Sequence, residues 1–144
     1  IPIDFSPASR DAAKEALALV RGFGGRAIFL HVLDISYLYP AAYGVEPVIL
    51  PPVKPEDIEP EWQEFLGTLP LADIAWEKQT CEGPAARHIA EAATALNADV
   101  VVIGTHGRTG VAHMLLGSVA EAVLRLTDCS VLTVRPDAFQ FELP

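Results

Sequence analysis

The chain has few cysteines. Cys81 and Cys129 are the only two, and they do not form a CxxC pair. Two cysteines cannot supply the disulfide framework of a small secreted domain. This usage fits a reducing compartment, and we expect both thiols to be buried as small apolar side chains.

Long apolar runs are also missing. No stretch approaches the roughly 18 consecutive apolar residues that a membrane-spanning helix requires. No charged segment followed by an apolar one opens the chain, so the sequence does not predict a signal peptide. We therefore expect a soluble, cytoplasmic protein without a membrane partner.

Positive charge is scarce as well. The chain carries 19 acidic against 10 basic residues, a formal net charge of -9. The average field of such a protein repels nucleic acid and anionic lipid, so any anionic ligand must be held by local groups. What the sequence does have is 51% apolar residues in a length of 144, which suffices for the core of one compact domain.

Strand patterns alternate with helical patterns along the chain. Strands are expected at residues 1–3, 26–33, 74–80, 100–103 and 130–135. Helices are expected at residues 7–20, 61–67, 85–96 and 118–127. The first strand looks like the end of a buried strand whose leading residues precede Ile1. This order implies right-handed βαβ units and a doubly wound five-stranded parallel sheet with helices on both faces, an α/β fold.

Residues 37–72 differ in texture from the rest. They hold seven of the twelve prolines, all three tyrosines and six carboxylates. We expect a variable, Pro-rich surface insert with one short helix, whose aromatic residues could form a lid or a partner surface. With this insert and a C-terminal tail at 137–144, residues 1–144 are expected to form a single domain.

A glycine-rich segment lies between the strand that ends at residue 103 and the helix that begins at Ser118. Gly104, Gly107 and Gly117 allow close backbone approach and expose amides to phosphate oxygens. Ser118 and Glu121 have the spacing of a capping box, and the helix start adds unpaired amides and a positive dipole end. The segment predicts an anion site, although its glycines could merely form the turn that leaves the sheet. It is neither a Walker A loop nor a GxGxxG turn.

The glycines follow a specific spacing. Two residues separate Gly104 from Gly107, nine separate Gly107 from Gly117, and Ser118 follows directly. This pattern resembles the motif of the ATP-binding branch of the universal stress protein family. The similarity extends to residues 2–6, to the His-Val pair at 31–32 and to residues 129–135. It implies a five-stranded parallel sheet of order 3-2-1-4-5, commonly dimeric through the last strand.

The resemblance also implies a set of ligand contacts. It places Pro2, Asp4 and Val32 around the adenosine. Ile103 and Gly104 are expected to lie beneath the ribose and phosphates. The phosphate chain is expected to contact Gly107, Gly117, Ser118 and Val119. A divalent metal, Mg²⁺, is expected with ATP, because this acidic chain supplies few cations to balance the triphosphate. No residue is assigned as a metal ligand or as a catalytic group.

Several single residues allow more than one interpretation. Asp4 could bond local backbone amides rather than a ligand. Arg108, the only basic residue between Gly104 and Ser118, could close over a phosphate or stay solvated. His106 and His113 lack the cysteines or clustered carboxylates of a metal site, and His31 and His88 are expected to be packed and solvated respectively.

The last strand is expected at an edge of the sheet. Val131, Leu132 and Val134 leave both of its faces largely apolar, and unprotected edges favour pairing. We expect a homodimer across this strand. The alternative is coverage by the tail at 137–144.

Three functions remain in competition. The first is an ATP-binding regulatory or stress-response module with little or no catalysis. The second, a slow ATP hydrolase or phosphotransferase, requires a positioned base and a cationic clamp, and neither is evident. The third, an interaction module without nucleotide, is expected to lose glycines from the loop, and this chain retains them.

Overall fold

The computed structural model describes residues 1–33, 54–105 and 116–135. In chain order its elements are β1 (Pro2–Ile3), α1 (Pro7–Phe23), β2 (Arg26–Leu33), the 3₁₀ helix η2 (Pro55–Ile58), α2 (Glu59–Gly67), β3 (Ala75–Glu82), α3 (Ala85–Ala95), β4 (Val100–Gly104), α4 (Ser118–Leu126) and β5 (Ser130–Val134). The predicted strands and helices are confirmed with similar bounds. Within this part of the chain no helix is long and apolar enough to cross a membrane.

The strands form parallel ladders. β2 lies between β1 and β3, and β4 pairs with β5. β1 also contacts β4, so the two ladders adjoin at these strands. The α/β class with parallel strands is therefore confirmed. The joining of both ladders into one sheet of order 3-2-1-4-5 stays a prediction.

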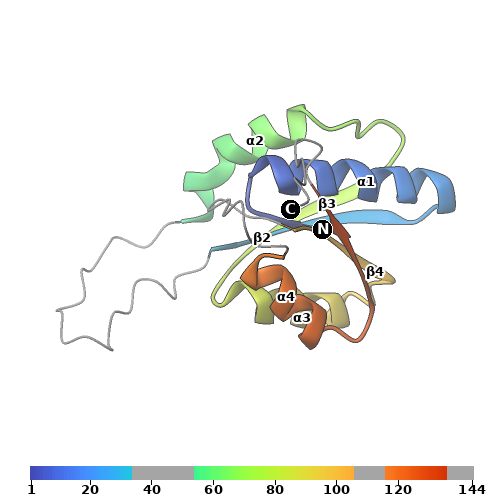
Figure 1. Cartoon of the computed structure of the whole chain (residues 1–144). Helices are drawn as coiled ribbons and strands as arrows, with labels where there is room; N and C mark the ends of the chain where they lie inside the picture. The colour runs from blue at the N-terminus through green and yellow to red at the C-terminus, as the bar shows by residue number, and fades with distance from the viewer. Residues whose placement is uncertain (34–53, 106–115, 136–144) are drawn as a thin grey trace, which may run out of the picture.

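Helices cover both faces of the strands (Figure 1). α1 and α2 lie on one face, while α3 and α4 lie together on the other. Side chains alternate accordingly: Phe29 of β2 packs in the core under α1 and α2, and its neighbour Leu30 packs with α3. In β4, Val102 packs against the alanines of α1.

The start of α1 follows the predicted local rules. Ser6 is the N-cap and accepts a hydrogen bond from the Ser9 amide at 3.2 Å, and Pro7 occupies the first turn. The helix presents small side chains to the strands, since Ala12 and Ala13 are fully buried. α1 can therefore approach β4 closely, which positions the turn before it beside the end of β4.

One face of the described part of the Pro-rich stretch belongs to the core. Ile58, Trp62, Phe65 and Leu69 are all buried, and Trp62 and Phe65 are each 1% exposed. The short helix expected at 61–67 is confirmed, but the expectation of a surface insert is wrong for this buried face. The prolines of η2 and α2 lie in first turns, where a helix tolerates them. Residues 37–53 of the predicted insert and the tail lie outside the described residues.

Candidate functional site

The turn after β1 is held by local hydrogen bonds. The Ser6 amide donates to Asp4 Oδ1 at 3.0 Å, so one carboxylate oxygen of Asp4 bonds the backbone. Phe5, between them, has a φ of +64°, a left-handed conformation that bulky side chains rarely adopt. The turn is thus a fixed and strained piece of backbone at the carboxyl end of β1.

β2 ends beside this turn. His31 pairs with Ile3 of β1, and its Nδ1 lies 2.6 Å from the Ile3 carbonyl oxygen. A carbonyl only accepts, so Nδ1 carries the proton and donates it. The ring is 6% exposed, which confirms the prediction of a packed histidine. The next residue, Val32, is half-buried at the carboxyl end of β2.

The end of β4 requires a glycine. A Cβ at Gly104 would lie 2.9 Å from the backbone carbon and oxygen of Ala8, in the first turn of α1. Such a contact is closer than carbon atoms allow, so the backbones can approach this closely only without a side chain. Gly104 therefore brings β4 and the start of α1 together.

Both ends of the segment between β4 and α4 are tied to this edge. The Thr105 amide donates to the Val134 carbonyl of β5 at 2.8 Å. Its carbonyl accepts from the Gly117 amide at 2.6 Å. The start of α4 is consequently fixed next to the carboxyl end of β4, although residues 106–115 lie outside the described part of the chain.

The predicted capping box at the start of α4 is wrong. Gly117 is the N-cap, with its carbonyl accepting from the Glu121 amide at 2.9 Å, and Ser118 is the first helical residue. Glu121 pairs with Arg125 at 2.7 Å instead of reaching back. The Gly117 amide donates to the Thr105 carbonyl, and the N-cap is therefore Gly117, one residue before Ser118, which the sequence predicted as the cap.

This start of α4 has the chemistry of an anion site. The first amides of an α-helix have no carbonyl partner within the helix, and the helix dipole makes this end positive. In α4 these amides belong to Ser118, Val119 and Ala120; Ser118 and Val119 are exposed residues, and Ala120 is buried. A phosphate group is the typical ligand of such a terminus in a doubly wound fold.

The structure brings most of the predicted ligand-binding residues to one edge, at the carboxyl ends of the strands: Asp4, Val32, Gly104, Gly117, Ser118 and Val119. Ile103 is near them, but its side chain is buried in the core and leaves only backbone for a ligand. Pro2 is buried in β1 and faces the opposite end. Gly107, His106, Arg108 and His113 lie outside the described residues. No group of three or more potential metal ligands occurs in the described ranges.

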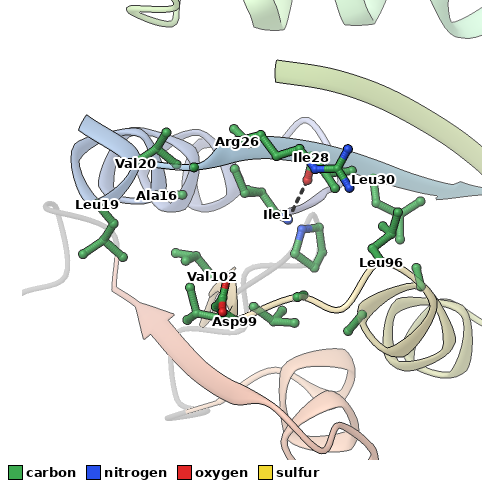
Figure 2. A pocket seen from close by; sticks show the side chains of 18 of the residues that line it. Ile1, Ala16, Leu19, Val20, Arg26, Ile28, Leu30, Leu96, Asp99 and Val102 are labelled. Carbon is green, nitrogen blue, oxygen red and sulfur yellow. Dashed lines mark hydrogen bonds between the residues drawn. The ribbon is translucent and has the colours of Figure 1, made fainter. Parts of the chain in front are cut away.

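A cavity of about 640 Å³ lies at the opposite end, between the amino ends of β2 and β4 (Figure 2). Leu19, Val20 and Leu96 contribute to its largely apolar wall. The Ile1 nitrogen donates a hydrogen bond to the Ile28 carbonyl there at 2.8 Å. This cavity has no helix N-terminus of the kind found at Ser118, so it is separate from the candidate site.

Parallel strands, helices on both faces and a helix N-terminus at the carboxyl edge define an α/β protein of the doubly wound type. Residues 1–135 match the Universal stress protein family, and the chain belongs to this family. The predicted membership of the universal stress protein family is thereby confirmed, and the ATP-binding branch stays a prediction.

Individual relatives cover nearly the whole chain. Universal stress protein MJ0531 of Methanocaldococcus jannaschii is 34% identical over 94% of this chain and 79% of its own length. Universal stress protein A homolog 1 of Coxiella burnetii is 36% identical over 92% of this chain and 91% of its own. Both matches therefore compare whole domains.

Solved structures agree with the fold. The structure of protein MJ0577 superposes with a TM-score of 0.73 at 24% identity, covering 93% of this chain and 92% of that one. A universal stress protein in complex with cAMP gives a TM-score of 0.63 at 21% identity, over 95% and 94% of the two chains. At these identities the likeness concerns the fold.

Proposed function

We propose that this chain binds ATP at the carboxyl edge of its strands and acts as a regulatory module of the stress response with little or no catalysis. The observation that carries the proposal is the start of α4. Its first turn, in which Ser118 and Val119 are exposed, is fixed beside the end of β4 by the hydrogen bond from the Gly117 amide to the Thr105 carbonyl. A polyphosphate can bind there without net positive charge on the protein.

This proposal assigns the phosphate chain to four residues: the amides of Ser118 and Val119 would donate to it, and Gly117 and Gly107 would let the backbone approach it. Two more residues, Ile103 and Gly104, would lie beneath the ribose and phosphates. A Cβ at 104 would meet the backbone of Ala8 and push α1 away from β4, so the glycine keeps the start of α1 close to this edge.

The adenosine is assigned to the adjacent turn. Asp4 directly follows β1, and Val32 lies one residue before the end of β2. Ile3 pairs with His31, so Asp4 and Val32 each come directly after a residue of this pair. Pro2, which is part of the same predicted set, would act through β1 rather than through an exposed surface. Adenine is further supported by the related protein that was solved in complex with cAMP.

Mg²⁺ fits the proposal as a companion of the triphosphate. The proposed contact residues include no lysine or arginine, so a divalent ion would balance charge that the protein does not. The same composition argues against efficient phosphoryl transfer, which needs a positioned base and a cationic clamp. The chain's own contribution is to bind and orient the nucleotide through backbone amides.

A homodimer through β5 is also proposed. In the part of the chain that the structure describes, β5 pairs only with β4, so its other edge is open. Leu132 is 40% exposed on this strand, and Val131 and Val134 are half-buried. A second β5 would cover both the open edge and the exposed leucine. The two free cysteines fit a reducing, cytoplasmic location.

Nucleotide content tests the proposed function directly. The purified protein is denatured, the released small molecules are identified by mass spectrometry, and the refolded or nucleotide-free protein is titrated calorimetrically with ATP. GTP, which carries the same triphosphate, is the matched control for adenine recognition. We expect ATP to bind more tightly than GTP. The absence of binding by ATP, ADP, AMP and cAMP would contradict the proposal.

A further inference from the structure

Four aromatic rings pack together behind the turn that follows β1. We call Phe5, His31, Trp62 and Phe65 the aromatic cluster. The Phe5 ring is 4.6 Å from the His31 ring, 5.2 Å from Trp62 and 5.8 Å from Phe65, measured between centroids. Trp62 and Phe65 come from α2 and are each 1% exposed. One helix thus supports the turn from the side opposite to solvent.

Trp62 is also held by contacts with β3. Its Nε1–H donates to Thr80 Oγ1 at 3.1 Å. Lys78, also on β3, lies 2.6 Å from both carboxylate oxygens of Glu59 and 5.8 Å from the Trp62 ring centroid. These contacts hold α2 against β3, and they lower the pKa of the Glu59 carboxyl through its hydrogen bond to Lys78. Trp62 therefore provides a rigid surface for the Phe5 ring.

The backbone of Phe5 needs such a surface. Its φ of +64° is unfavourable for a bulky residue, and such a conformation persists only where surrounding contacts determine it. Asp4 precedes Phe5, and Val32 follows His31 of the same cluster. The aromatic cluster thus supports both segments to which the proposed adenosine contacts belong.

We propose that Trp62 is a positioning residue for nucleotide binding, which through the Phe5 ring holds the Asp4–Phe5–Ser6 turn in the conformation that receives the adenosine. This inference rests on the proposed function. Trp62 is buried, so it acts without touching the ligand. α2, which arises from the Pro-rich part of the sequence, thereby becomes part of the binding machinery.

A double-mutant cycle tests this coupling. Trp62→Leu removes the supporting ring, and Phe5→Gly removes the supported ring while a glycine adopts the same φ without strain. We expect each change alone to weaken ATP binding of the folded protein by about tenfold, and the double variant to bind no more weakly than Phe5→Gly alone. Trp76→Leu is the control, because Trp76 lies on β3 outside the aromatic cluster and is 41% exposed. It should leave the affinity unchanged.

Affinities are measured by calorimetry at temperatures where circular dichroism shows each variant fully folded, so that lost stability is not read as lost binding. If Trp62→Leu does not fold, Trp62→Phe is used in its place. The phenylalanine keeps an aromatic ring but cannot form the hydrogen bond to Thr80, and we then expect the affinity for ATP to fall about threefold. Additive losses, or a Trp62 variant that binds as tightly as Trp76→Leu, would overturn the proposal.

A readout without nucleotide separates this inference from the proposed function. The Ser6 amide bonds Asp4 Oδ1, so its hydrogen exchange reports the turn itself. Trp62→Leu should accelerate exchange at Ser6, and Trp76→Leu should not. If the parent binds no adenine nucleotide but Ser6 responds in this way, the proposed function fails and the coupling of Trp62 to the turn stands. Unchanged exchange at Ser6 would refute the positioning role.

Discussion

Replacement of Ser118 by proline removes one amide from the start of α4 and nothing else that the helix needs. Ser118 is the first helical residue, where proline is favoured. The preceding Gly117 has φ −70° and ψ 153°, an extended conformation that suits a residue before proline. The variant should therefore fold, with a free energy of unfolding within about 0.5 kcal/mol of the parent.

The loss of binding follows from the donor that is removed. A hydrogen bond from an amide to a charged phosphate oxygen contributes about 1.5–3 kcal/mol. The dissociation constant for ATP should therefore rise roughly 10- to 100-fold in Ser118→Pro. Ser118→Ala is the matched control, because it keeps the amide and loses only the hydroxyl, and it should bind within about threefold of the parent.

Calorimetric titration with ATP and urea unfolding are performed on all three proteins. The titration gives the affinity, and the unfolding curve shows whether the helix survived. If Ser118→Pro binds ATP as tightly as the parent, with an unchanged unfolding midpoint, the phosphates do not bind at the start of α4. Equal losses in the proline and alanine variants would assign the contact to the hydroxyl and not to the amide.

Two further outcomes are expected. Gly104→Ala should cost about 1–3 kcal/mol of stability, since its Cβ meets the Ala8 backbone at 2.9 Å; a midpoint equal to the parent's would disprove that contact. Leu132→Lys should convert a dimer to a monomer in light scattering, whereas a parent that is already monomeric would refute pairing through β5.

Much of the fold could be predicted because its signals are local. Residues 26–33 form an apolar run without polar alternation, and the structure has a strand with those bounds. Ser6 followed by Pro7 marks a helix start in sequence, and it is one. The capping of α4 could not be decided in this way, because Ser118 and Gly117 are both acceptable N-caps. The deciding contact is the hydrogen bond from Gly117 to Thr105, which sequence does not display.

Composition concealed the role of α2. The prolines and carboxylates of residues 37–72 indicate a surface insert, yet Ile58, Trp62, Phe65 and Leu69 recur at intervals of four, three and four residues, the spacing of one helical face. That periodicity was the available signal. The packing of Trp62 on Phe5 could not be predicted from the sequence, because it depends on the register of β2 with β3 and on the position of α2 over these strands.

The candidate site was predictable in its parts and not in its geometry. The glycine spacing identified Gly104 and Gly117, but the reason for a glycine at 104 is the approach of Ala8, almost a hundred positions away in the chain. The strain at Phe5 likewise has no signature in sequence, since most residues with a positive φ at turns are glycine or asparagine.

The amide spectrum of isotopically labelled protein during ATP titration tests the central claim most directly. Backbone amides report which part of the molecule the nucleotide contacts, residue by residue. We expect the largest shifts at Ser118 and Val119, with further shifts at Gly104 and at the Asp4 turn. Shifts confined to the apolar cavity near Ile1 and Leu19, or none at millimolar ATP, would contradict a nucleotide site at the carboxyl edge of the strands.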